Sequence, residues 1–155
     1  MITRRLLLAA GAFAGLGLFR PAWAETLPLV TVSKDPSCGC CSGWVDHLRA
    51  AGFPVKVIET QTIEATKRRL GVPDDLASCH TAEVAGYVVE GHVPAAAIMR
   101  LLSEKPQGKG LAVPGMPAGS PGMEMAGVEP ETYDVILFGA GSPSVFARFK
   151  GGAPV

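Results

Sequence analysis

The apolar positions of the chain fall into short continuous runs and into longer stretches with helical spacing. Runs rich in β-branched and aromatic residues predict five strands, over 29–33, 54–58, 86–89, 133–138 and 145–149. Helical spacing predicts three helices, from Cys38 to about Ala51, over 62–70, and from Pro94 to about Ser103. Residues 106–127 follow neither period and are rich in proline and glycine, which predicts a long loop.

The order of these elements predicts the fold class. Strand and helix alternate three times, and two further strands follow that can form a hairpin, which favours an α/β fold on a mixed sheet flanked by helices. Cys38 and Cys41 have Cys-x-x-Cys spacing where the first strand meets the first helix, a position typical of thioredoxin-like folds. We therefore expect a thioredoxin-like domain with a Pro/Gly/Met-rich loop before the C-terminal hairpin. We find no internal repeat.

Residues 1–24 have the pattern of a secretory signal peptide. Arg4 and Arg5 precede the uncharged, apolar stretch 6–19, and the small-x-small site Ala22-Trp23-Ala24 follows. A membrane-spanning helix needs about 20 apolar residues, so this stretch is too short. The arginine pair also suits the twin-arginine route. We expect cleavage near Ala24 and a single domain over 25–155 that is exported to the periplasm and has no membrane span.

Composition narrows the function classes. The chain is 48% hydrophobic and 18% charged, which excludes a disordered chain. Removing residues 1–24 takes away three arginines and no acidic residue, so 11 basic and 14 acidic residues remain and the net charge is −3. No basic surface of the kind that recruits nucleic acid is expected. All four cysteines stay in the exported chain, where they meet an oxidising compartment.

Three of the four cysteines lie at the predicted start of the first helix. The helix dipole favours anions there, so the pKa values of the thiols at Cys38, Cys40 and Cys41 should fall. A disulfide between the neighbours Cys40 and Cys41 would strain the backbone, so a local disulfide should join Cys38 to Cys41. Thiolates at this position suit both disulfide exchange and soft-metal binding.

The presence of a third cysteine in this motif favours metal binding over disulfide exchange. Disulfide exchange needs only an attacking and a resolving thiol, whereas binding of Cu(I) or Zn(II) gains from each added thiolate. Cys79 can supply a fourth sulfur. We therefore predict a metal site made by Cys38, Cys40, Cys41 and Cys79. The thiolates alone would accept copper as Cu(I) or zinc. The alternative is a framework of two disulfides, Cys38–Cys41 and Cys40–Cys79.

Histidines and methionines add secondary candidates. His80 adjoins Cys79, and Met116 lies in the predicted loop, where a thioether is not explained by core packing. Both are candidate metal ligands. His47 is expected to be a solvated helix residue, and His92, after a predicted turn, to be structural.

A set of motifs along most of the chain resembles a known family. The segments are 32–41 with Trp44, 77–81 with Cys79-His80, 89–94, 110–117 and 119–123. Together they resemble the CopG-like periplasmic copper-resistance family, a metal-binding group formerly described as a domain of unknown function. The similarity extends over residues 29–149. It implies a thioredoxin-like fold, copper bound through Cys38, Cys40, Cys41 and Cys79, and a role in copper resistance with redox cycling of the metal.

These observations give one leading hypothesis and two alternatives. The leading one is an exported protein that binds Cu(I) or Cu(II) and sequesters it or passes it to other periplasmic copper-handling proteins. The first alternative is a periplasmic thiol-disulfide oxidoreductase with Cys38 and Cys41 as its redox pair. A combined form, an oxidoreductase acting on copper itself, is also open. The second alternative is a disulfide-stapled binding module without a metal.

Overall fold

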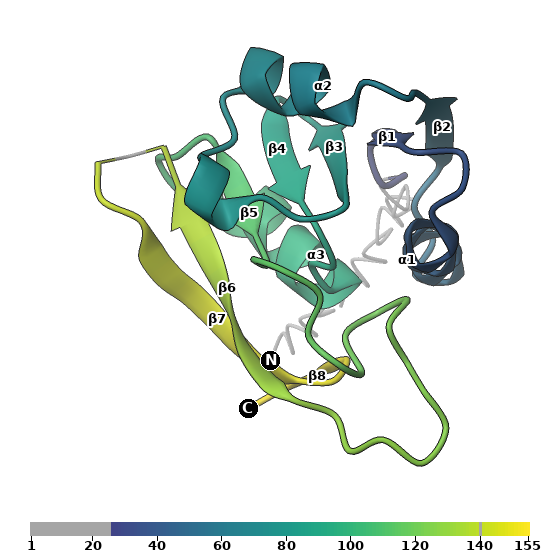
Figure 1. Cartoon of the computed structure of the whole chain (residues 1–155). Coiled ribbons are helices and arrows are strands. Elements are labelled where there is room, and N and C mark those ends of the chain that lie inside the picture. Colours follow the sequence, from purple (N-terminus) through teal and green to yellow (C-terminus); the bar gives the residue numbers. More distant parts are fainter. Residues whose placement is uncertain (1–25, 140) are drawn as a thin grey trace, which may run out of the picture.

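A computed structural model describes residues 26–139 and 141–155, and the predicted signal peptide lies outside this range. The described part contains three α-helices, one short 3₁₀ helix and eight strands (Figure 1). In chain order they are β1 (Val30–Lys34), α1 (Gly39–Ala50), β2 (Val55–Glu59), α2 (Ile63–Leu70), η1 (Asp74–Leu76), β3 (His80–Val84), β4 (Tyr87–Glu90), α3 (Ala95–Glu104), β5 (Gly110–Ala112), β6 (Thr132–Phe138), β7 (Ser144–Lys150) and β8 (Ala153–Pro154).

All eight strands form one mixed sheet in the order β2-β1-β3-β4-β5-β6-β7-β8 (Figure 1). The pairs β1–β2 and β4–β5 are parallel, and the other pairs are antiparallel. The predicted α/β class, the mixed sheet flanked by helices and the C-terminal hairpin of β6 and β7 are confirmed. No helix in residues 26–139 and 141–155 combines the length and apolarity that crossing a membrane requires.

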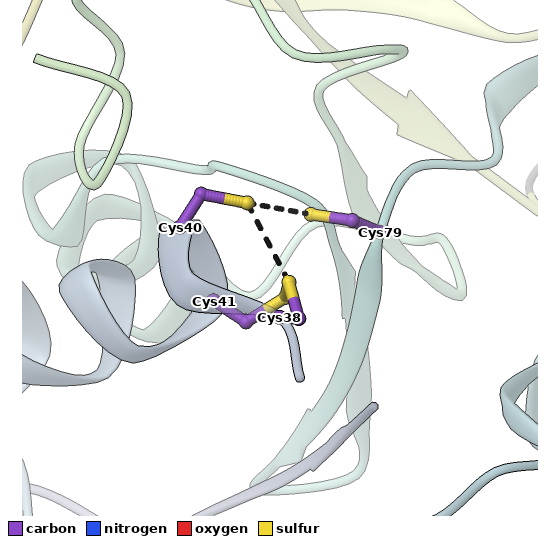
Figure 2. A group of neighbouring side chains, drawn as sticks. All are labelled: Cys38, Cys40, Cys41 and Cys79. Atoms are coloured by element: carbon purple, nitrogen blue, oxygen red, sulfur yellow. Dashed lines mark hydrogen bonds between the residues drawn. A yellow bond between two sulfur atoms is a disulfide. The ribbon is translucent and has the colours of Figure 1, made fainter. Parts of the chain in front are cut away.

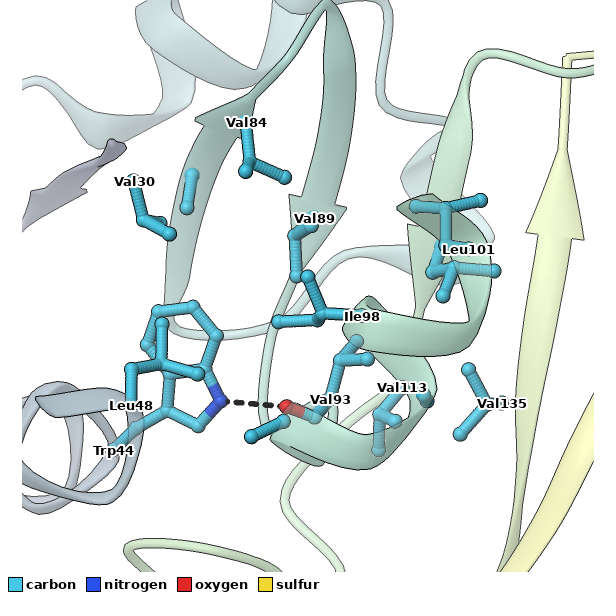
Figure 3. Close-up of a cluster of buried hydrophobic side chains, with 14 of the residues drawn as sticks. Val30, Trp44, Leu48, Val84, Val89, Val93, Ile98, Leu101, Val113 and Val135 are labelled. Carbon is cyan, nitrogen blue, oxygen red and sulfur yellow. Dashed lines mark hydrogen bonds between the residues drawn. The ribbon is translucent and has the colours of Figure 1, made fainter. Parts of the chain in front are cut away.

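The helices cover both faces of the sheet because strand side chains alternate between them. Helices α1 and α3 pack on one face, where Val30, Val89 and Val135 belong to the larger apolar core (Figure 3). The end of α2 and η1 pack on the other face, against Val88 and Phe138. Polar groups on this second face must find hydrogen-bond partners inside the protein.

Trp44 fixes α1 on the first face. Its side chain is fully buried, and its indole Nε1 donates a 2.9 Å hydrogen bond to the carbonyl of Val93, just before α3 (Figure 3). Val45 and Leu48 are buried beside it, so the predicted inward face of this helix is confirmed. The result is a rigid placement of the first turn of α1, which carries the cysteine cluster.

Three strands were not expected from the sequence. The first, β3, alternates polar and apolar residues, yet its polar residues His80 and Thr81 are fully buried. The second, β5, has only three residues and lies inside the segment predicted as a loop. At Gly110 a Cβ would lie 1.8 Å from the carbonyl oxygen of Val88, so only glycine permits this strand pairing. The third, β8, has two residues at the sheet edge.

Candidate metal centre

A tight turn delivers the cysteine motif to the start of α1. The carboxylate of Asp35 accepts hydrogen bonds from the backbone N–H and the hydroxyl of Ser37, and the Asp35 carbonyl accepts one from the N–H of Cys38. The side-chain and backbone bonds from Ser37 lower the pKa of Asp35. Such a turn ends the strand and directs the next residues into the helix. Cys38 is the N-cap residue of α1, and Cys40 and Cys41 occupy its first turn.

Cys38 and Cys41 form a disulfide, the local pairing that the sequence predicts, with a Cα–Cα distance of 5.4 Å (Figure 2). Cys41 is fully buried under the helix, whereas Cys38 is partly exposed. Cys40 and Cys79 are free thiols, so the two-disulfide framework is not formed in this state. The structure therefore holds a disulfide and two thiols side by side.

Cys79 joins the cluster from the segment between η1 and β3. Its Sγ lies 3.8 Å from the Sγ of Cys40, which in turn lies 3.5 Å from the Sγ of Cys38 (Figure 2). All four sulfur atoms lie within 4.8 Å of one another. The structure thus gathers the four cysteines that the sequence analysis placed in one site.

Two histidines lie against Cys79 and form a second group of possible ligands with it. The Sγ of Cys79 is 3.1 Å from Nε2 of His92 and 3.4 Å from Nδ1 of His80, and the three ligand atoms lie within 4.8 Å of one another. Nδ1 of His92 lies 2.8 Å from the carbonyl oxygen of Pro121, which can only accept, so the proton is assigned to Nδ1. This leaves Nε2 of His92 with a lone pair that points at the Cys79 thiol.

Burial keeps this group uncharged near neutral pH. It raises the pKa of the Cys79 thiol to about 12, with a further increase from the neighbouring Cys40. Burial lowers the pKa of His80 and of His92, and for His80 the charges of nearby His92 and Lys67 act in the same direction. Cys79 is thus a protonated thiol, which must lose its proton to become a thiolate ligand, and both imidazoles are neutral and able to bind a metal.

His80 is fully buried and only partly satisfied. Its ring lies 4.4 Å from the Trp44 ring and 5.0 Å from the His92 ring, measured between centroids. Its Nε2 has no hydrogen-bond partner among the described residues. An orphaned imidazole nitrogen in the interior is uncommon. The His80 nitrogen that faces the cluster is Nδ1, and together with Nε2 of His92 and the two thiols it gives a donor set of sulfur and nitrogen atoms. The residues present therefore fit a soft or borderline metal ion.

The segment between β5 and β6 passes directly over the start of α1. A Cβ at Gly122 would lie 2.5 Å from the carbonyl oxygen of Cys40, and the hydroxyl of Ser78 donates to the carbonyl of Gly115. These contacts place this segment beside the residues that carry Cys40 and Cys79. Met116 follows Gly115, and its side chain is 53% exposed.

One expectation for the histidines was wrong, and another was incomplete. His47 is not simply solvated, because it is half-buried and its Nε2 accepts a 3.0 Å hydrogen bond from the backbone N–H of Ala95 at the start of α3. His92, which was expected to be structural, bonds the carbonyl of Pro121 through Nδ1 and also contacts Cys79 through Nε2. The signal that could have identified His92 is its position two residues after β4, beside the strand β3 that follows Cys79, but β3 has no clear pattern in the sequence.

Comparisons with known proteins agree with this picture. A family model described as "Protein of unknown function, DUF411" matches residues 76–123, and no curated protein matches the chain. Two solved structures, forms 1 and 2 of copper resistance protein CopG, are 45% and 44% identical to the chain, each with a TM-score of 0.74. The matches cover 81% and 79% of this chain and 99% and 98% of the CopG chains. The chain therefore belongs to the CopG copper-resistance protein family.

Proposed function

We propose that the protein is an exported copper-binding protein that acts in copper resistance and holds Cu(I) in the cysteine cluster. The observation that carries the proposal is the convergence of four sulfur atoms within 4.8 Å of one another. Thiolates are soft ligands that favour Cu(I), and the similar CopG structures are named for copper resistance. Zinc accepts the same donors, so the choice of copper depends on the family.

The ligands in this proposal are Cys38, Cys40, Cys41 and Cys79 in the reduced protein. Four thiolates confined to one site would repel one another strongly, and more than one Cu(I) bridged by shared sulfurs relieves that charge. His80 is an additional candidate, because its Nδ1 faces the Cys79 sulfur. Met116 is a further candidate, since it follows Gly115, whose carbonyl accepts a hydrogen bond from Ser78, the residue before Cys79.

The strand order in the first half of the chain supports a thioredoxin-like fold, in which the cysteine motif lies at the start of the first helix. Strands β1 to β4 lie in the order β2-β1-β3-β4, with β1 and β2 parallel and the other two pairs antiparallel. The Cys-x-x-Cys pair lies at the start of α1, as in thioredoxin-like folds. We infer that residues 25–155 form one such domain, with β5 to β8 as an extension of its sheet.

The disulfide favours a second candidate function. Cys38 and Cys41 are oxidised in the structure, and the free thiol of Cys40 lies 3.5 Å from the Cys38 sulfur. The Cys38–Cys41 disulfide could exchange electrons with other thiols, so that the protein would act as a periplasmic thiol-disulfide oxidoreductase. It could also exchange them with the metal: the disulfide takes up two electrons and two protons to give two thiols, while two Cu(I) ions become two Cu(II) ions.

Export is part of the same proposal. Residues 1–24 would direct the chain to the periplasm, by the general or the twin-arginine route, and would be removed near Ala24. An oxidising compartment accounts for a disulfide at Cys38–Cys41. Other periplasmic copper-handling proteins are the expected partners.

Copper counting in two redox states tests the function. The mature protein is reduced, desalted anaerobically and loaded with Cu(I), and the metal and the free thiols are counted; a second sample keeps its disulfide. We expect four free thiols and full copper loading in the reduced sample. The oxidised sample should have two free thiols and bind less copper, because Cys38 and Cys41 are not available as thiolates.

Two results would separate the alternatives. If the reduced protein binds no copper but exchanges its disulfide with other thiols, the oxidoreductase hypothesis replaces the proposal. If the disulfide resists reduction in the folded protein and no metal binds, the cysteines only staple the fold.

A further inference from the structure

The carboxylate of Glu90 lies at the centre of a buried polar network on the face of the sheet that α2 covers. Glu90 is the last residue of β4 and is fully buried. Its Oε1 accepts hydrogen bonds from the backbone N–H of Ser78, at 2.6 Å, and from Nζ of Lys67. Its Oε2 accepts a 2.6 Å hydrogen bond from the hydroxyl of Thr81. Lys67 and Ser78 are 23 and 12 residues away from Glu90 in the sequence, and Thr81 pairs with Glu90 across the strands β3 and β4.

This network encloses the segment that carries Cys79. Ser78 and Thr81 flank the pair Cys79-His80, so a single carboxylate holds the chain on both sides of it. The backbone N–H of Gly91 donates to the carbonyl of His80, and a Cβ at Gly91 would lie 2.6 Å from the Ser78 side chain. The segment is therefore fixed by its polar contacts as well as by packing.

Lys67 explains how a charged carboxylate is tolerated there. It belongs to α2, is 3% exposed, and donates to Thr81 Oγ1 at 3.1 Å in addition to its ion pair with Glu90. A buried ion pair is often no more stabilising than apolar residues of similar size. Fold stability alone therefore does not require this pair, whereas the bond to the backbone of Ser78 does require an acceptor.

We propose that Glu90 is a positioning residue for Cys79. Its carboxylate, neutralised by Lys67, holds the Ser78–Thr81 segment so that the Cys79 sulfur stays within reach of Cys40. Cys79 is the cysteine that α1 does not carry, so its place in the cluster depends on contacts of this kind. The consequence for copper retention rests on the proposed function, but the placement of Cys79 can be measured without any metal.

The test is site-resolved alkylation of the oxidised mature protein, in which Cys40 and Cys79 are the free thiols. The double variant Lys67→Met/Glu90→Leu removes the bonds to Ser78 and Thr81 and leaves the net charge near Cys79 unchanged. Its matched control is Arg69→Met/Glu83→Leu, which removes an exposed ion pair between the same helix and β3. Iodoacetamide labelling of each cysteine is followed by mass spectrometry of peptides.

We expect Cys79 in the Lys67/Glu90 variant to react about fivefold faster or more than in the parent, because loss of the bonds to Ser78 and Thr81 frees this segment and exposes the half-buried Cys79 sulfur. Cys40 should change less than about twofold, and both cysteines should be unchanged in the control. An unchanged Cys79 rate in a folded variant would overturn the proposal. So would an equal rise at Cys40, which indicates general loosening.

If the double variant does not fold, Thr81→Val provides the second test, since it removes the bonds of Thr81 to Glu90 Oε2 and to Lys67 but keeps the Glu90–Ser78 bond and the ion pair. It should raise the Cys79 rate and not the Cys40 rate, and an unchanged rate would overturn the proposal. Copper loading of the same variants separates the two claims. Parent protein that binds no copper contradicts the proposed function, and the alkylation result still decides the role of Glu90.

Discussion

At the scale of residues, the cluster combines atoms in different chemical states. Cys38 and Cys41 are joined, while Cys79 is a thiol whose pKa burial raises to about 12. Nε2 of His92 faces that thiol with its lone pair. Protonated sulfur and neutral imidazole avoid the cost of buried charge while no metal is bound. Metal binding or reduction of the disulfide must therefore move protons as well as electrons or ions.

His47 gives a prediction about pH and stability. Burial lowers its pKa from the ordinary histidine value, and its Nε2 accepts the hydrogen bond from Ala95 only when that atom is unprotonated. Because the folded pKa is below the unfolded one, the unfolded chain binds more protons as the pH falls. The stability contribution is thus present above the unfolded pKa of about 6.5 and is lost as the pH falls through the folded pKa.

Urea unfolding of the parent and of His47→Gln at several pH values between 5 and 8 measures this effect. The unfolding free energy of the parent should fall below about pH 6.5, and that of the variant should fall less. His80 and His92 also have lowered pKa values, so part of the fall should remain in the variant. Parallel curves for the two proteins would contradict a role for His47 in the contact between α1 and α3.

At the scale of elements, α1 carries three of the four cysteines and its docking decides where they lie. Two hydrogen bonds join this helix to the start of α3, from the indole of Trp44 to Val93 and from the N–H of Ala95 to His47. Trp44 and His47 are three residues apart and share a helix face. The contact is therefore a defined clamp between two elements rather than general packing.

Trp44→Ala should destabilise the fold by about 3–5 kcal/mol, because a fully buried aromatic side chain is lost and a cavity remains. Urea unfolding of the variant and the parent measures the difference. Arg49→Ala, on the exposed side of the same helix, is the control and should change the unfolding free energy by about 0.5 kcal/mol or less. If Trp44→Ala also changed the unfolding free energy by only about 0.5 kcal/mol, α1 would present another face to the core.

Much of the fold follows from sequence patterns, and the exceptions have physical reasons. β1 and α1 have clear apolar periods that end at Asp35–Ser37 and at Gly52, so they could be predicted. β3 could not, because its polar residues Thr81 and His80 are buried against partners supplied by other elements. β5 is too short for a period to be recognised, and its pairing depends on the absence of a side chain at Gly110.

The candidate site also has one part that the sequence predicts and another that only the structure shows. Spacing alone groups Cys38, Cys40 and Cys41, and the preference of soft metals for added thiolates, with the family resemblance, suggested that Cys79 would join them. The contact of His92 with Cys79 and the network around Glu90 arise from the register of β3 on β4, which pairs Thr81 with Glu90. Local sequence carries no record of that register, so these residues became visible only in three dimensions.

At the scale of the whole molecule, the proposed export places the chain in an oxidising compartment. The Cys38–Cys41 disulfide is expected to persist in the periplasm and to be reduced in the cytosol. Mass spectrometry of the protein from intact cells should find the N-terminus at Glu25 or within a few residues of it. Full-length protein in the cytoplasmic fraction would contradict export and would remove the setting that the proposed function needs.

The central claim is a single metal site made by all four cysteines, and Cys79 is its most informative member. The most direct measurement is Cu(I) binding to anaerobically reduced parent, Cys40→Ser and Cys79→Ser proteins, with circular dichroism to confirm that each apo protein is folded. Both variants should lose copper stoichiometry or lose affinity by about tenfold or more, to a similar extent, because each removes one shared thiolate. If Cys79→Ser binds copper as the parent does, the four-cysteine site is wrong.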